Sequence, residues 1–155
     1  TVTRRQRQMC IRDRYFGFTR CPDICPRNLT KINAILQELK IPSHLLSNYF
    51  ISLDINRDNI QTIKAFIQQF QNFTGLKPQN QSQLRLLQNK FGIYAAKMTY
   101  AEYFQDPNIK SKNNDYLINH TSIIYIINNQ GKIIHAFSPE KSKDEIKNIF
   151  KSLAI

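Results

Sequence analysis

Apolar residues recur along the first half of the chain with two different periods. The aromatic run at 15–19 (YFGFT) is typical of a buried strand, and 48–54 (NYFISLD) has the same character. Between these runs the apolar positions are spaced as on one face of a helix, which should end near Lys40 because Pro42 follows. Two further helices are predicted, with Asp58 and Ser82 as their N-caps.

The second half predicts a strand over 93–99 and a polar loop over 105–115. Two hydrophobic runs, Thr121–Ile127 and Lys132–Phe137, flank the turn residues NNQG and predict a hairpin. A last helix should begin near Ser142. The order β-α-β-α-(α)-β-β-α resembles a thioredoxin-like α/β domain, in which helices flank a central mixed sheet.

The composition suits one domain and argues against several classes of protein. The 155 residues are 41% hydrophobic. The sequence contains no run of 18 or more apolar residues, which is the length a helix needs to span a bilayer. The net charge of +11 suggests nucleic-acid binding. However, the lysines are spread along helical segments and the aromatic residues fall at core spacings, so we expect no nucleic-acid partner.

Residues 1–14 (TVTRRQRQMCIRDR) differ from the rest of the chain. They carry five arginines and one aspartate, hence +4 of the total charge, and they lack the apolar region of a signal peptide. The string MCIRDR resembles the translation of a sequencing adapter, and a natural basic arm is the alternative. We therefore expect residues 1–14 to be a non-native or disordered tail, give Cys10 no functional weight, and assign the domain to residues 15–155.

The segment CPDICP at 21–26 is the most informative motif. Its cysteines, Cys21 and Cys25, lie three residues apart in a loop that leads into a helix, so they could converge on one ion. Amides at a helix N-terminus lower thiol pKa values and favour the thiolate that binds metals. Pro26 favours Cys25 as the N-cap rather than a residue within the helix. A structural disulfide or two buried thiols are the alternatives.

Three histidines could complement the cysteines. His120 lies just before the predicted strand at 121–127, at a strand entrance that thioredoxin-like folds bring close to the cysteine turn. By itself, such a histidine is more often a surface or capping residue. His44 lies in a loop and His135 in a hairpin strand, so both are expected to be structural or to face solvent.

The pattern around these residues resembles the Sco/SenC family. The resemblance rests on motifs that occur in the family's order between Tyr15 and Phe137: YFGFTRCPDICP at 15–26, FISLD at 50–54 followed by RD at 57–58, GL at 75–76, FGIY at 91–94, and NHT at 119–121 followed by Tyr125. It implies a thioredoxin-like domain that is anchored in the inner membrane and faces the periplasm or the mitochondrial intermembrane space. It also implies copper bound by Cys21, Cys25 and His120.

The donor chemistry agrees with copper. Soft thiolates select Cu(I), and imidazole is a compatible third ligand. Structural zinc usually takes four ligands, and the sequence offers no fourth cysteine or histidine as a candidate ligand. We read Asp23, between the cysteines, as a residue that shapes the loop or helps docking. The resemblance implies a role in the assembly of cytochrome c oxidase, with the copper-bearing subunit and a copper donor as partners.

The chain departs from the family in three respects. Arg20 and Asn119 stand where members often have histidine and usually have aspartate, so the site should be more electropositive and hold Cu(II) less well. The first hairpin and the membrane anchor, which precede the Tyr15 motif in the family, have no counterpart before Tyr15 in this sequence. We therefore expect an N-terminally truncated domain and one uncovered sheet edge.

A thiol–disulfide oxidoreductase that acts on the cysteines of the oxidase copper site is the alternative function, with Cys21 and Cys25 as its redox pair. Thioredoxin-type enzymes usually carry CxxC and a cis-proline that faces it. This chain has CxxxC, and no proline occurs between Pro107 and Pro139. The spacing therefore favours a metallochaperone over an enzyme.

Overall fold

The computed structural model describes residues 11–112 and 115–153. Its strands are β1 (Ile11–Gly17), β2 (Leu46–Ser52), β3 (Phe73–Leu76), β4 (Ala95–Met98), β5 (Leu117–His120), β6 (Ile124–Ile127) and β7 (Ile133–Phe137). Its helices are α1 (Ile24–Leu39), α2 (Ile60–Ile67), α3 (Gln81–Phe91), α4 (Tyr100–Phe104) and α5 (Lys143–Ser152).

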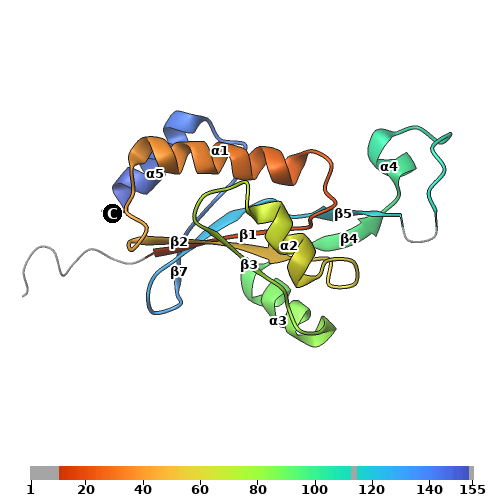
Figure 1. Cartoon of the computed structure of the whole chain (residues 1–155), viewed down its shortest axis with the longest axis horizontal. Coiled ribbons are helices and arrows are strands. Elements are labelled where there is room, and N and C mark those ends of the chain that lie inside the picture. Colours follow the sequence, from red (N-terminus) through yellow and green to blue (C-terminus); the bar gives the residue numbers. More distant parts are fainter. Residues whose placement is uncertain (1–10, 113–114, 154–155) are drawn as a thin grey trace, which may run out of the picture.

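The main sheet has five strands in the order β3-β2-β1-β6-β7. Strands β1, β2 and β3 are parallel to one another. Strand β6 runs antiparallel to β1, and β7 runs antiparallel to β6. Strands β4 and β5 form a separate antiparallel pair at one end of the molecule, next to α4 (Figure 1). This confirms the predicted α/β class with a central mixed sheet, and it confirms the β6–β7 hairpin.

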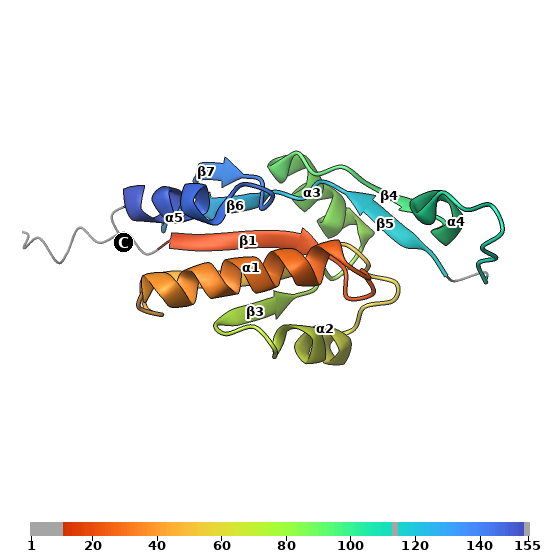
Figure 2. The same ribbon diagram turned by 90° about the horizontal axis from the view of Figure 1, so that it is seen from above.

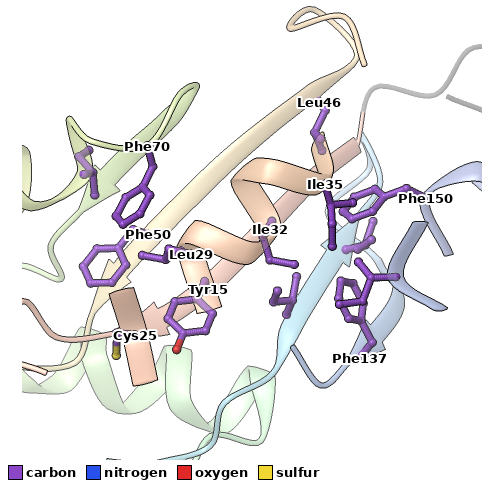
Figure 3. Close-up of a cluster of buried hydrophobic side chains, with 14 of the residues drawn as sticks. Tyr15, Cys25, Leu29, Ile32, Ile35, Leu46, Phe50, Phe70, Phe137 and Phe150 are labelled. Atoms are coloured by element: carbon purple, nitrogen blue, oxygen red, sulfur yellow. The ribbon is translucent and has the colours of Figure 1, made fainter. Parts of the chain in front are cut away.

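Helices cover both faces of the main sheet. Helices α1 and α5 lie side by side on one face, and α3 packs on the other (Figures 1 and 2). The larger core lies beneath α1, where Leu29, Ile32 and Ile35 meet Phe50 of β2 and Phe150 of α5 (Figure 3). Each such side chain stabilises the fold by about 1.5–3 kcal/mol through burial. The cysteine loop between β1 and α1 is therefore attached to the best-packed part of the protein.

The helix caps differ in part from the prediction. Ser142 caps α5, close to where that helix was predicted to begin. The caps predicted for the two middle helices are wrong, because Asn59 caps α2 and Asn80 caps α3. The Asp58 carboxylate is not free to cap a helix, since it accepts hydrogen bonds from Ser52 and from Thr19.

Strand β1 begins at Ile11, four residues before the predicted strand. It is longer because Ile11 pairs with β2 and Arg12 pairs with both β2 and β6, which extends the ladder into the stretch predicted to be a tail. The rest of that stretch, residues 1–10 with Cys10, lies outside the described residues. Among the described helices, none has the length and apolarity required to cross a membrane.

One residue of β1 conflicts with its surroundings. Asp13 is fully buried on the same face as Ile11 and Tyr15, and neither of its carboxylate oxygens has a hydrogen-bond partner. Burial raises the pKa of Asp13 to about 8, against a smaller lowering by the backbone of Tyr49. A buried carboxyl without a partner favours its neutral form and weakens the fold when it ionises.

Candidate metal centre

The cysteine loop connects β1 to α1 at the carboxyl end of a central parallel strand. Binding sites in open α/β sheets commonly lie at this position. Asp23 is the N-cap of α1, and Pro26 lies in its first turn. The prediction that Cys25 is the N-cap is wrong, because α1 begins at Ile24 and Cys25 lies within the first turn. The helix starts earlier because the amide of Arg27 already donates to the Asp23 carbonyl, at 3.0 Å.

Gly17 allows Cys25 to approach the sheet. A Cβ atom at position 17 would lie 3.0 Å from Cys25 Sγ and 3.0 Å from the Phe50 ring. These distances are too short for a comfortable contact, so a larger residue would push Cys25 away. Cys25 is fully buried at this point, whereas Cys21 is half-buried and partly open to solvent. Both cysteines are free thiols.

His120 faces Cys25 from the end of β5. Its Nε2 lies 3.6 Å from Cys25 Sγ, and its Nδ1 lies 2.9 Å from the carbonyl oxygen of Thr121. Because a carbonyl only accepts, Nδ1 carries the proton and the Nε2 lone pair is directed toward Cys25. Burial lowers the pKa of His120, with the Thr121 carbonyl opposing, so the neutral ring is favoured. A neutral imidazole held in this way is ready to bind a metal.

The two thiols differ in acidity. A hydrogen bond from the Cys25 thiol lowers the pKa of Cys21 to about 6, although burial raises it, and the backbone amides of the helix start lower it further. The Cys25 amide itself donates to Cys21 Sγ at 3.4 Å. The same thiol contact, followed by burial, raises the pKa of Cys25 well above its usual value. Cys21 is therefore a thiolate at neutral pH, and Cys25 retains its proton.

These contacts bring together the three residues singled out from the sequence. Cys25 touches Cys21 on one side and His120 on the other. Among residues 11–112 and 115–153, no group of three or more His, Cys, Asp or Glu side chains is already arranged around a common metal position. A metal ion would displace the proton shared by the thiols and draw Cys21 into place. Two soft sulfurs and a neutral imidazole nitrogen fit copper.

The carboxylate of Asp58 holds the cysteine loop to β2. It accepts hydrogen bonds from the Thr19 amide at 3.1 Å, from the Thr19 hydroxyl at 2.5 Å and from the Ser52 hydroxyl at 2.6 Å. Thr19 lies only two residues before Cys21. Sequence reasoning missed this role because Thr19 and Asp58 lie 39 residues apart along the chain.

The RD motif also supports the segment that carries His120. Arg57 Nε donates to Asp54 at 2.5 Å, and Arg57 donates to the carbonyl oxygen of Tyr116 at 2.7 Å. The Tyr116 hydroxyl donates to Asp54 at 2.8 Å, which closes the cluster just before β5. The loop that follows β2 therefore reaches both halves of the candidate site.

A small pocket of about 160 Å³ opens onto the candidate site. Its lining includes Cys21 and His120 together with Phe18, Met98 and Tyr103. Phe18 packs edge-on against the His120 ring, with the ring centroids 5.9 Å apart. The pocket gives a partner access to the exposed side of Cys21, whereas Cys25 remains covered.

The other polar candidates lie away from this group. His44 and His135 are exposed and do not line the pocket, as expected. Arg20 and Asn119, the two departures from the family pattern, are exposed beside the site. Asp23 is exposed and lies 3.4 Å from Arg27, so its carboxylate is directed to solvent rather than to the sulfurs.

Comparisons with known proteins agree with the fold and the motifs. The family model SCO1/SenC matches residues 8–154. The SCO2-like protein of Rickettsia prowazekii is 32% identical over 139 residues, with 89% of this chain and 63% of the relative covered. The human mitochondrial SCO1 homolog is 31% identical over 134 residues, with 85% and 41% covered. The chain therefore spans less than two thirds of the length of either relative.

The solved structures include the ScoI protein of Bradyrhizobium japonicum with copper bound. It has a TM-score of 0.74 and 25% sequence identity, with 92% of this chain and 84% of that chain covered. The likeness confirms the predicted thioredoxin-like architecture. The family match over nearly the whole sequence, together with these relatives, shows that the chain belongs to the SCO1/SenC family.

Proposed function

We propose that this protein is a metallochaperone that binds one copper ion through Cys21, Cys25 and His120 and delivers it during the assembly of cytochrome c oxidase. The observation that carries the proposal is the 3.6 Å contact between Cys25 Sγ and the unprotonated Nε2 of His120, beside the loop that bears Cys21. The copper-bound relative from B. japonicum and the family's role in oxidase assembly support it.

The three donors suit the transfer of Cu(I). Two thiolates and one neutral imidazole give a Cu(I) site a net charge of −1, and three ligands leave a coordination position open for a ligand from the acceptor. Cys21 is the donor that is exposed to the pocket, so it is the ligand that an incoming thiolate would replace first. Cys25 and His120 would hold the ion until that exchange is complete.

The partners follow from this role. The acceptor is the copper-bearing subunit of cytochrome c oxidase, and a second protein supplies the copper. The full-length protein would be anchored in the inner membrane, with this domain facing the periplasm or the mitochondrial intermembrane space. The human relative is named as mitochondrial, which supports a mitochondrial location as one of these two alternatives.

A transfer assay tests the proposal. The Cu(I)-loaded protein is mixed with the metal-free copper-bearing domain of the oxidase, and the copper in each protein is measured after they are separated. We expect one copper per chain before mixing and its appearance on the oxidase domain afterwards. Failure of the wild-type chain to bind copper would overturn the proposal, and copper binding without transfer would restrict the protein to storage.

The asymmetry of the two thiols favours a second candidate function, thiol–disulfide exchange. Cys21 is half-exposed and acidic, and Cys25 is buried and holds its proton. This pairing of an attacking thiolate with a buried resolving thiol is what a reductase requires. Insulin reduction by the metal-free protein distinguishes the candidates, because rapid turnover would favour the reductase.

The pH dependence of Cys21 alkylation checks this asymmetry. The pKa of Cys21 is about 6, so the rate of reaction of the metal-free protein with iodoacetamide should rise with pH and reach half its maximum near pH 6. The Cys25→Ala variant removes the thiol that donates to Cys21 and should move the midpoint to higher pH. A wild-type midpoint near 8.5, the value of an ordinary thiol, would contradict the assigned contact.

A further inference from the structure

Tyr15 is a buried phenol next to the candidate metal centre that the proposed copper ligands do not explain. It lies in β1, it is 2% exposed, and its ring stacks on Phe50 with the centroids 6.4 Å apart. Figure 3 shows its hydroxyl oxygen turned toward the end of α1 that carries Cys25. Packing would be served equally well by phenylalanine, so the hydroxyl requires a reason of its own.

The Asn28 amide fixes the direction of the hydrogen bonds at this hydroxyl. Asn28 lies one turn into α1, is 2% exposed, and donates through Nδ2 to the Tyr15 oxygen at 3.4 Å. Since the oxygen accepts this bond, its own proton remains to be donated to another neighbour. A buried hydroxyl that fails to donate its proton would destabilise the fold, so an acceptor is expected close by.

The acceptor is the sulfur of Cys25. The two side chains meet beside Gly17, where a Cβ atom would lie 3.0 Å from Cys25 Sγ and 3.1 Å from Cε1 of the Tyr15 ring. Although Cys21 and burial raise the pKa of Cys25, the Tyr15 hydroxyl lowers it as a donor to the sulfur. Ser122 also lies beside the hydroxyl and donates to it. Cys25 therefore has a hydrogen-bond donor within the core, besides its contacts with Cys21 and His120 at the site.

We propose that Asn28 and Tyr15 form a hydrogen-bond relay that donates to Cys25 Sγ and sets the electron density on this sulfur when copper is bound. The proposal rests on the proposed copper site and assigns Tyr15 as a positioning residue rather than a ligand. A hydrogen bond to a metal-bound thiolate withdraws electron density from the sulfur and favours the less charged metal ion. The relay therefore favours Cu(I) over Cu(II) at this site.

The Tyr15→Phe variant tests the relay because it removes only the hydroxyl. Both proteins are loaded with Cu(II), and the thiolate-to-copper charge-transfer band is recorded. We expect the band of the variant to move to longer wavelength, since the electrons of an unbonded sulfur are held less tightly. The ratio of Cu(I) to Cu(II) affinity should fall about tenfold, the effect of one hydrogen bond to a charged group.

Two further variants serve as controls for the loss of a hydroxyl and for an unpaired Asn28 amide. Tyr125→Phe removes a hydroxyl from a tyrosine packed on the opposite face of the sheet and should leave the band unchanged. The double variant Tyr15→Phe/Asn28→Leu removes both polar partners, so it should show the same band shift without leaving the Asn28 amide unpaired. An unshifted band in both Tyr15 variants, each with one copper per chain, would overturn the relay, whereas a wild type that binds no copper would overturn the proposed function.

Discussion

Substitution of Asp13 by valine is expected to raise the free energy of unfolding far more at pH 8 than at pH 5. Asp13 is buried without a partner, and its pKa is raised to about 8 in the folded protein, against about 3.9 in an unfolded chain. The folded state therefore holds a proton that the unfolded state releases, and stability is lost as pH rises between these two values. Valine has no ionisable group, so the variant does not lose this stability as pH rises.

The difference in free energy of unfolding between the Asp13→Val variant and the wild type should increase by about 4 kcal/mol from pH 5 to pH 8. Urea unfolding at pH 5 and pH 8, followed by circular dichroism, measures it. Asp115→Val, at an exposed position, is the matched control and should show no such widening. An equal gap at both pH values would contradict the assigned pKa of Asp13.

Substitution of His120 by alanine is expected to lower the affinity for Cu(I) by at least about 100-fold. Loss of a residue that merely orients a metal ligand costs about 10–100-fold, and the loss of a ligand should cost more. Competition with a chromophoric Cu(I) chelator measures the affinity. His135→Ala is the control, because His135 is exposed on β7 and does not line the site pocket. Equal affinities for the wild type and His120→Ala would remove His120 from the site.

The elements with strong local signals could be predicted from the sequence. Helix α1 has a long apolar stripe that ends before Pro42, and the β6–β7 hairpin has its turn residues in place. The four-residue strands β3 and β5 were missed because they are defined by pairing with β2 and β4 rather than by their own sequence. His120 consequently ends a strand of its own instead of preceding the strand at 121–127. Helix α4 was missed although Thr99 and Glu102 form a capping box.

The candidate site could be predicted only as far as its possible ligands. The CPDICP and NHT motifs identified Cys21, Cys25 and His120 as candidate ligands because their side chains can bind copper. The residues that support them were not found, since their roles depend on contacts between distant segments. Tyr15 looked like a core residue and Asp58 like a helix cap, but one hydroxyl reaches Cys25 and one carboxylate holds Thr19.

X-ray absorption spectroscopy of the Cu(I)-loaded protein is the most direct test of the copper site. We expect two sulfur neighbours and one imidazole nitrogen around the copper of the wild type. In His120→Ala the nitrogen should disappear while the two sulfurs remain. A wild-type spectrum with sulfur neighbours only, or one that keeps the imidazole signal in His120→Ala, would contradict a site built from Cys21, Cys25 and His120.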